Sequence, residues 1–345
     1  MSTIAHITLE NFTAFAVLDH SLSPGVNVII GANGTGKTHL LKVLYAACAV
    51  TVGEDRDKGF ALKLRNVFNP FEGRMGRLAR RLTTSVTTRG VVTLTGRAKK
   101  LSFEFSNHTV LPDRVTVTGE SAWKKNTLTS AYIPVKEMLA HAPGFLATTA
   151  NREIAFEEIY PDILKRAYLP KLMGPPDKNR QRLLTALQES IEGKVVTRGE
   201  HFFLKNQQGN LEFTLLAEGM RKLALVWLLI QNGTLQSGSV LFWDEPEANL
   251  NPALMGKVVE VILELHRQGV QVFLTTHNYV LLKEFDLRLQ HGDQIHYMSL
   301  CRDDSGAVSA NGGESYLDLN PNAIADTFDA LYDREISRSL GGVRP

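Results

Sequence analysis

Residues 31–38 read Gly31-Ala32-Asn33-Gly34-Thr35-Gly36-Lys37-Thr38 and match the phosphate-binding pattern G-x-x-x-x-G-K-[ST] at every fixed position. The β-branched run at 26–30 before it predicts a buried strand, and the leucines spaced through 39–44 after it predict a helix. In this context the loop N–H groups and the helix N-terminus bind phosphate oxygens. We expect Lys37 to reach the β- and γ-phosphates and the Thr38 hydroxyl to hold Mg²⁺, so the stretch predicts a nucleoside triphosphate site. The residues expected to contact the nucleotide are Gly31, Asn33, Gly34, Thr35, Gly36, Lys37, Thr38 and His39.

Two strands predicted in the second half of the chain end in polar residues. The hydrophobic run at 239–243 leads directly into Asp244 and Glu245. Acids at the carboxyl end of a buried parallel strand lie where phosphates bind in α/β folds, so we expect Asp244 to complete the Mg²⁺ shell. Glu245 is placed to act as the general base for the attacking water. The next strand, 270–274, leads into His277, which at that point can reach the γ-phosphate, although a lone histidine is more often structural. The predicted catalytic residues are Lys37, Glu245 and His277.

The composition is that of a globular, core-forming protein. Of 345 residues, 43% are hydrophobic and 21% are charged, and the formal net charge is +2, so any polyanion-binding surface must be local. Cys48 and Cys301 lie far apart without metal-ligand spacing, which argues against a disulfide framework and suits a reducing cytoplasm. The first residues lack the pattern of a secretion signal, and the longest apolar run, 223–230, is too short to span a bilayer. We therefore expect a cytoplasmic protein with no membrane partner.

The segment from residue 56 to residue 100 is strongly basic. Twelve lysines and arginines stand against Asp57 and Glu72, an excess of ten positive charges within a chain of net charge +2. Such a run is typical of a surface that contacts nucleic-acid phosphates, of one that binds an acidic partner protein, or of a solvated face. The segment holds no recognisable nucleic-acid-binding module, so all three interpretations stay open.

The rest of the chain alternates between strand and helix patterns. The predicted elements are two or three antiparallel strands at 3–30, a β-meander at 86–118, a strand at 131–134, helices through most of 151–193, a hairpin at 194–216 and a helix capped by Asn251-Pro252 that ends before Gly269. We expect Gly209-Asn210 to form the turn of the hairpin. Phe12 or Phe15 is a candidate to stack on the nucleobase, although a core position is the more ordinary role. Sustained heptads are absent, so no coiled coil is expected.

These motifs together resemble those of ABC-type ATPases. Gly31–Thr38 resembles Walker A, 244–250 resembles Walker B with the D-loop, and 275–277 resembles the switch-histidine segment. The chain is most similar to the transporter-independent branch, the Rad50, SMC and RecF heads and the OLD-like ATPases. Its stretch 320–335 resembles the tails of small ATPases in bacterial anti-phage systems such as PARIS and Septu.

The resemblance implies an architecture. The fold would be an α/β P-loop NTPase of the ABC-head type, with a mixed core sheet, an antiparallel β subdomain and a helical lobe, without a coiled coil. A single ATPase domain would cover 1–345. Its parts would be lobe I at about 1–150 and 234–345, with a basic insertion at 51–130, and a helical lobe carrying the signature at about 151–233.

The family also has a signature motif, L-S-G-G-Q, which binds the γ-phosphate of ATP held by a second subunit. The segment 216–220 corresponds to it, but Ala217 replaces the phosphate-binding serine and Glu218 replaces a glycine, while Gly219 matches. Losing a charge-assisted hydrogen bond costs about 1.5–3 kcal/mol, so we expect slow turnover or weak dimerisation unless a partner helps. The residues expected to contact ATP across the dimer are Ala217, Glu218, Gly219 and Asn249. No Q-loop glutamine is evident, and Glu137 takes the corresponding place, where it is expected to touch Mg²⁺ through water.

The resemblance implies an ATPase that converts ATP and water to ADP and phosphate, with ATP and Mg²⁺ as cofactors. Two heads would bind ATP between them in a dimer or higher oligomer. The acids after residue 300 are scattered, so we expect the effector, a nuclease or toxin, to be a separate chain. DNA is a further possible partner through 56–100, and anti-phage defence and DNA maintenance both stay open. The alternatives are a scaffold that binds ATP without hydrolysis, a stand-alone RecF-like repair ATPase, and a transporter's nucleotide-binding subunit.

Overall fold

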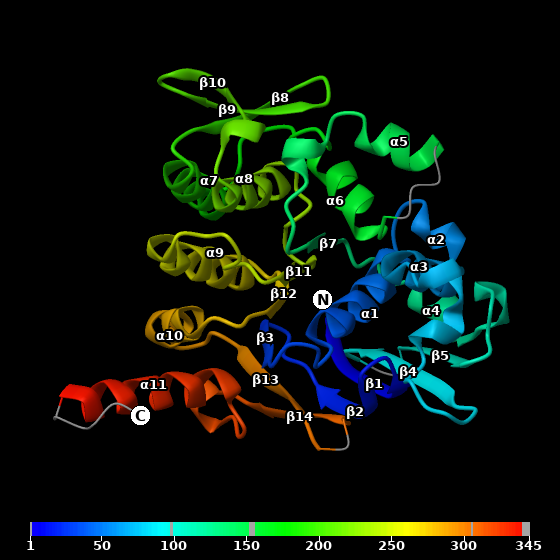
Figure 1. The fold of residues 1–345 in the computed structure, drawn as a ribbon. Coiled ribbons are helices and arrows are strands. Elements are labelled where there is room, and N and C mark those ends of the chain that lie inside the picture. The colour runs from blue at the N-terminus through cyan, green and yellow to red at the C-terminus, as the bar shows by residue number, and fades with distance from the viewer. Residues whose placement is uncertain (1, 97–98, 152–155, 305, 340–345) are drawn as a thin grey trace.

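One large mixed sheet organises the chain. The computed structural model describes residues 2–96, 99–151, 156–304 and 306–339. Its eleven-stranded sheet has the order β6-β5-β4-β1-β2-β14-β13-β3-β12-β11-β7, and a separate antiparallel sheet has the order β10-β9-β8 (Figure 1). The strands of the large sheet are β1 (Ile4–Phe12), β2 (Phe15–Ser21), β3 (Val26–Gly31), β4 (Thr87–Leu94), β5 (Lys100–Ser106), β6 (Thr116–Thr118), β7 (Ser130–Ile133), β11 (Val240–Asp244), β12 (Gln271–Thr275), β13 (Ile295–Arg302) and β14 (Val308–Gly313). Those of the small sheet are β8 (Lys194–Arg198), β9 (His201–Asn206) and β10 (Gly209–Glu212).

Helices flank this sheet. They are α1 (Lys37–Ala49), α2 (Asp55–Lys58), α3 (Phe60–Phe68), α4 (Glu120–Trp123), α5 (Phe145–Asn151), α6 (Ile159–Ala167), α7 (Lys178–Ser190), α8 (Glu218–Gln231), α9 (Met255–Arg267), α10 (Tyr279–Arg288) and α11 (Ala323–Ser339). Short 3₁₀ helices span Phe71–Gly73, Met75–Leu78, Pro112–Arg114, Leu139–His141, Phe213–Leu215, Pro252–Leu254 and Tyr316–Asp318. In Figure 1 the small sheet lies beside α7 and α8, while α2, α3 and α4 lie on the opposite side of the molecule from α9 and α10. Within the described residues, no helix is both long and apolar enough to cross a membrane.

The strand before the phosphate-binding loop lies inside the parallel part of the sheet. All six residues of β3 are buried, as expected for a strand that is covered on both faces. β3 pairs in parallel with β12 and β13, and β11 pairs in parallel with β12 and β7. Because the carboxyl ends of these strands meet at one edge, the sheet brings the loop 31–38 next to 244–245 and 275–277. This edge is where the predicted motifs converge.

Most of the predicted elements are confirmed, and one turn is wrong. β1 and β2 form the antiparallel pair, β4 to β6 form the meander, and no coiled coil occurs among the described residues. Gly209 and Asn210 belong to β10, paired with Asn206 and Lys205, instead of forming the hairpin turn. The turn lies two residues earlier, at 207–208, where the Asn206 side-chain oxygen accepts the backbone N–H of Gln208 at 2.9 Å and stabilises the turn.

Both aromatic residues considered for base stacking lie in the core. Phe12 is fully buried and makes edge-on ring contacts with Phe68 and Phe103. Phe15 is also fully buried, and its ring lies directly under Gly36 of the phosphate-binding loop. The ordinary role, core packing, therefore holds for both.

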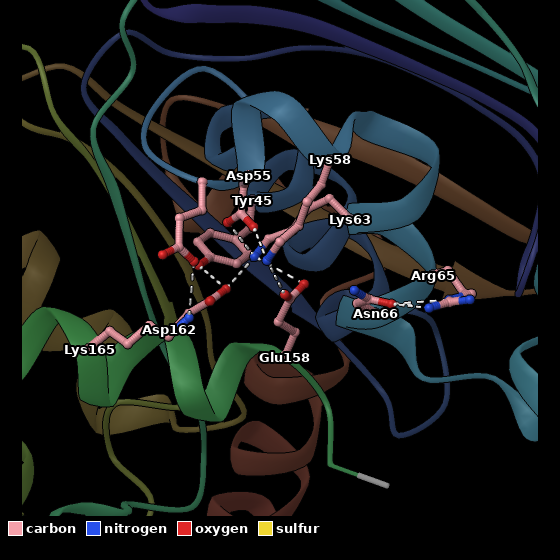
Figure 2. A network of polar contacts seen from close by, with 10 residues as sticks. Tyr45, Asp55, Lys58, Lys63, Arg65, Asn66, Glu158, Asp162 and Lys165 are labelled. Atoms are coloured by element: carbon pink, nitrogen blue, oxygen red, sulfur yellow. Dashed lines mark hydrogen bonds and ion pairs between the residues drawn. The ribbon is translucent and has the colours of Figure 1, made fainter. Parts of the chain in front are cut away.

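Part of the basic segment is built into the fold. Figure 2 shows Lys63 pointing from α3 toward carboxylates at the start of α6. Its Nζ lies 2.7 Å from Asp55, 3.2 Å from Glu158 and 2.5 Å from Asp162, and its side chain is fully buried. The Tyr45 hydroxyl donates to the same Asp162 oxygen at 2.8 Å. Burial lowers the pKa of Lys63, but the three carboxylates outweigh it and raise that pKa. This cluster joins α2 and α3 to α6.

The arginines between residues 74 and 81 are arranged differently. Arg74, Arg77 and Arg81 are exposed. The backbone of this stretch hydrogen-bonds to the end of β1 and to the turn that follows it. Arg80 N–H donates to Asn11 and Thr13 N–H donates to Leu78, both at 2.8 Å. That turn lies at the same edge of the sheet as the phosphate-binding loop. Arg97 lies outside the described residues.

A histidine pair crosses the sheet above a glycine. His20 on β2 and His296 on β13 bring their Nε2 atoms to 2.8 Å, reaching over β14 at Gly312. A Cβ atom on Gly312 would lie 2.6 Å from both rings, so only glycine fits there. Burial, together with the charge of His296, lowers the pKa of His20 to about 4.

The histidine pair predicts acid sensitivity. Because the pKa of His20 is lower in the folded state than the ordinary value of about 6.5, only the unfolded chain takes up this proton as the pH falls from 6.5 toward 4. We expect the free energy of unfolding to decrease over that window, by less than about 1.4 kcal/mol per pH unit for this group, since the ring is partly exposed. Urea unfolding at several pH values should show a shallower decrease for His20→Gln and an unchanged one for His291→Gln at an exposed site. Equal slopes in wild type and His20→Gln would contradict the assignment.

Candidate active site

Among the described residues, no hydrogen bond is made by the N–H groups of loop residues 32–36, so they can bind a ligand. Helix α1 begins at Lys37, and its N-cap, Gly36, has a φ of 94° and supplies no side-chain hydrogen bond. A Cβ atom on Gly36 would lie 2.8 Å from the Phe15 ring, so both the φ angle and the space require glycine. The first N–H groups of a helix without a side-chain cap favour an anion. The loop therefore fits a phosphate.

Lys37 lies folded back on this loop. Its Nζ donates to the carbonyl oxygens of Gly31 at 2.8 Å and Ala32 at 3.0 Å. Burial lowers the pKa of Lys37 to about 8, against the opposing effect of the Glu245 and Asp244 carboxylates. The ammonium group is thus held at the loop, beside the place where phosphate oxygens would bind.

Asp244 is at the centre of a polar cluster on three strands. Its Oδ1 accepts hydrogen bonds from Thr275 Oγ1 at 2.6 Å and Thr38 Oγ1 at 3.2 Å, and its Oδ2 accepts from the Tyr132 hydroxyl at 3.0 Å. Two neighbouring oxygen ligands of an octahedral Mg²⁺ lie about 3 Å apart, close to the separation of the Thr38 and Asp244 oxygens. These hard oxygen donors fit Mg²⁺.

Glu245 and His277 face each other beside this cluster. His277 Nε2 lies 3.2 Å from Glu245 Oε1. Glu245 has a φ of 48°, an unusual value for a residue with a side chain, and its N–H donates to Thr275 Oγ1 at 3.1 Å. Burial, followed by the charge of Lys37, lowers the pKa of His277. The neutral imidazole and the carboxylate thus stand together at the strand ends, where a water near the γ-phosphate would bind.

Glu137 and His39 both make contacts within the protein. Glu137 Oε2 bonds Arg221 Nε of α8 at 2.5 Å, and its Oε1 accepts the backbone N–H of Leu139, so both oxygens are engaged within the protein. This favours a structural link to α8 over the predicted contact with Mg²⁺. His39 packs against the Phe68 ring, and burial lowers its pKa to about 4. Its predicted contact with the nucleotide stays a prediction.

The residues predicted to act across a dimer lie on one small surface. Ala217 is the N-cap of α8 and supplies no side-chain hydrogen bond. The next residue, Glu218, accepts a hydrogen bond from Asn249 Nδ2 at 2.9 Å. A Cβ atom on Gly219 would lie 2.9 Å from the Asn249 carbonyl oxygen and 2.8 Å from Leu250. The degenerate signature segment and the loop after Glu245 are therefore packed together in one chain.

Sequence reasoning missed three residues of this site. Tyr132 was assigned only to a strand, yet its hydroxyl binds Asp244. Thr275 belongs to the segment 275–277, but no role was predicted for it. Its Oγ1 donates a hydrogen bond to Asp244 and accepts one from the Glu245 backbone N–H. Glu247 accepts the Thr276 hydroxyl at 2.6 Å and the His277 N–H at 2.9 Å. Of the three, only Thr275 had a signal visible in the sequence, its position at a strand end two residues before His277.

Comparison with known families gives one match over most of the chain. Residues 26–283 match the family described as "AAA domain, putative AbiEii toxin, Type IV TA system". That range contains the phosphate-binding loop, the strand that ends at Asp244, and His277.

Comparison with individual proteins gives shorter or more distant similarities. The chain is 48% identical over 40 residues to the DNA replication and repair protein RecF of Lacticaseibacillus casei (strain BL23), covering 12% of this chain and 11% of RecF. It is 28% identical over 179 residues to a probable branched-chain amino acid transport ATP-binding protein, LivG, of Archaeoglobus fulgidus, covering 50% of this chain and 63% of LivG. These matches thus span less than two thirds of either relative's length.

Solved structures of SMC heads share the fold. The structure of an SMC head bound to the C-winged helix domain of ScpA aligns with a TM-score of 0.52 at 13% identity, covering 90% of this chain and 97% of that one. The SMC head of Pyrococcus furiosus with an extended coiled coil, bound to the C-terminal domain of ScpA, aligns with a TM-score of 0.51 at 11% identity, covering 97% of this chain and 100% of that one. At such identities the likeness concerns the fold alone.

Proposed function

Because this chain belongs to that AAA-domain family and has the fold of an SMC head, we propose that it is an ATPase whose ATP-bound form pairs head to head with a second copy and thereby controls a separate effector protein. The observation that supports hydrolysis most directly is the pairing of Glu245 with His277 beside Asp244 and Lys37. A clamp that only binds ATP needs no general base at this position.

In the proposed reaction each residue acts at a stated place. Lys37 and the free N–H groups of the loop bind the β- and γ-phosphates, and Thr38 and Asp244 hold Mg²⁺. Mg²⁺, when bound, neutralises charge that develops on the phosphate oxygens. Glu245 accepts the proton of the attacking water, and His277 orients the γ-phosphate and the carboxylate. Tyr132 and Thr275 fix the rotamer of Asp244.

The proposed dimer places the N-terminus of α8, where Ala217 is exposed and Glu218 is partly exposed, at the interface between the two copies. Ala217, Glu218 and Gly219 would face the γ-phosphate bound to the other copy through the N-terminus of α8. Glu218 brings a negative charge to that place, where its hydrogen bond to Asn249 holds the carboxylate. We expect this charge to weaken the ATP-dependent pairing of the two copies. An effector or another ligand would then control how strongly they pair.

The test is the mass of Glu245→Gln protein measured by light scattering, with and without ATP and Mg²⁺. The carboxamide keeps the site's shape but cannot take a proton, so the variant should trap an ATP-bound dimer. Lys37→Ala is the matched control, because it should stay monomeric with ATP. An unchanged mass for Glu245→Gln with bound ATP, together with robust hydrolysis by a wild-type monomer, would overturn the dimer mechanism.

Two measurements of ATP hydrolysis by the wild-type protein distinguish a role in DNA maintenance from control of an effector. Hydrolysis stimulated by DNA alone would support a role in DNA maintenance, with the arginines of 74–81 as the contact surface. Hydrolysis or dimerisation that changes only when a neighbouring gene's product is added would support control of an effector. We favour the second outcome because the matched family is described in terms of toxin–antitoxin systems.

A further inference from the structure

The loop after Glu245 contains a carboxylate that the proposed reaction does not use. Glu247 is only partly exposed, and its Oε1 accepts two hydrogen bonds, from Thr276 Oγ1 at 2.6 Å and from the His277 backbone N–H at 2.9 Å. Its Oε2 is buried and has no hydrogen-bond partner among the described residues. A buried carboxylate oxygen without a partner is unfavourable, so the bonds made by the other oxygen must compensate for it.

One of those two bonds is donated by His277, the histidine assigned above to the catalytic site. The His277 backbone is held by Glu247, while its ring reaches back to Glu245 at 3.2 Å. Glu245 and Glu247 are two residues apart, on either side of Pro246. A single short loop of the chain thus fixes both ends of His277, its backbone N–H and its imidazole.

The same loop is anchored on its other side by α8. Lys222, which is buried, donates its Nζ to the Ala248 carbonyl at 2.8 Å, and Asn249 donates to Glu218 at 2.9 Å. These bonds flank Glu247 on its C-terminal side. Glu247 therefore has little freedom to follow His277 if the histidine moves, and acts as a fixed point for it.

We propose that Glu247 is a positioning residue that holds the His277 imidazole against Glu245 for hydrolysis, an inference that rests on the proposed ATPase function. Among the described residues, the side-chain hydrogen bonds of Glu247 are made to Thr276 and His277 and not to Lys37, Thr38 or Asp244. Its role is geometric: without its acceptor, the His277 N–H and the Thr276 hydroxyl lose their common partner, and the imidazole is no longer kept 3.2 Å from the general base. Small displacements of this kind reduce catalysis strongly while substrate binding persists.

The experiment compares Glu247→Ala with Glu247→Gln. The amide oxygen of glutamine can accept the same two hydrogen bonds, and its NH₂ group takes the place of the oxygen that has no partner. Alanine removes the acceptor. Glu260→Ala is the control, because the Glu260 side chain on α9 is 46% exposed and its one ion pair within the described residues is with Lys257 at 3.1 Å.

We expect kcat of Glu247→Ala to fall by about ten- to a hundredfold with KM for ATP nearly unchanged, and kcat of Glu247→Gln to stay within about threefold of wild type. In the nucleotide-free protein, hydrogen exchange of the peptide that contains the His277 amide should accelerate at least about tenfold in Glu247→Ala alone. Equal loss in both variants, or unchanged exchange in Glu247→Ala, would overturn the proposal. If wild type does not hydrolyse ATP, the proposed function fails, while the exchange measurement still decides whether Glu247 positions His277.

Discussion

Replacing Glu245 with glutamine is expected to slow ATP hydrolysis by about 10²–10⁴-fold, the usual contribution of a general base, while ATP still binds. The carboxamide has nearly the same shape as the carboxylate but cannot accept the proton of water. The groups assigned to binding, Lys37, Thr38 and Asp244, are untouched by the change. The positive φ of Glu245 suits either side chain equally, so the backbone should stay as it is.

Phosphate release under saturating ATP gives the rate, and calorimetry on the same preparation gives the affinity. Glu260→Gln is a matched control, because it introduces the same chemical change at a partly exposed position of α9 outside the proposed site and should leave hydrolysis within about threefold of wild type. Hydrolysis by Glu245→Gln within tenfold of wild type would place the base elsewhere. A loss of ATP binding would instead make Glu245 a binding residue.

Replacing Lys63 with alanine is expected to lower the free energy of unfolding by about 3–5 kcal/mol. Its ammonium is the buried cation shared by Asp55, Glu158 and Asp162, and removing it leaves three carboxylates facing one another without that charge (Figure 2). Removing one member of a buried ion cluster lowers the free energy of unfolding by more than the cluster as a whole contributes to it, because the remaining charges stay desolvated without a partner.

Urea unfolding measures this loss, and Lys58→Ala is its control. Lys58 contacts Asp55 at 3.2 Å and Glu158 at 3.3 Å, but 34% of its side chain is exposed, so its removal should cost less than about 1 kcal/mol. Equal losses for the two lysines would show that burial of Lys63 does not govern the cluster. The double variant Lys63→Met with Asp162→Asn should recover part of the loss, because it also removes one of the opposing charges.

The sequence predicted the fold class and the convergence of three motifs because those signals are local. Each motif follows its own predicted strand, so the three motifs can meet only if these strands are parallel neighbours. The structure pairs β11 with β12 and β12 with β3 in parallel. The partner strand β13, which completes the surroundings of β3, was not predicted, since nothing local to residues 295–302 specifies its neighbour.

Contacts set by tertiary placement were beyond the sequence. Lys63 looked like one more member of a basic surface, and only the fold shows that three acids from two other helices surround it. Glu137 was assigned to Mg²⁺ from its place after a strand, whereas Arg221, 84 residues later, takes its carboxylate. In both cases the charge pattern was visible, but the pairing of opposite charges depends on helices that meet only in the folded chain.

The position of β3 also sets when the protein can first bind a ligand during its synthesis. Its two neighbours, β12 and β13, lie at 271–275 and 295–302, some 240 or more residues after the start of β3. On the ribosome, the phosphate-binding segment therefore emerges well before its neighbours and stays unpaired on both edges until β12 and β13 have left the exit tunnel. Until then an apolar strand with two open edges is a site for association with chaperones or other nascent chains. Fragments that end before β12 should be found aggregated or bound to chaperones and should not bind nucleotide.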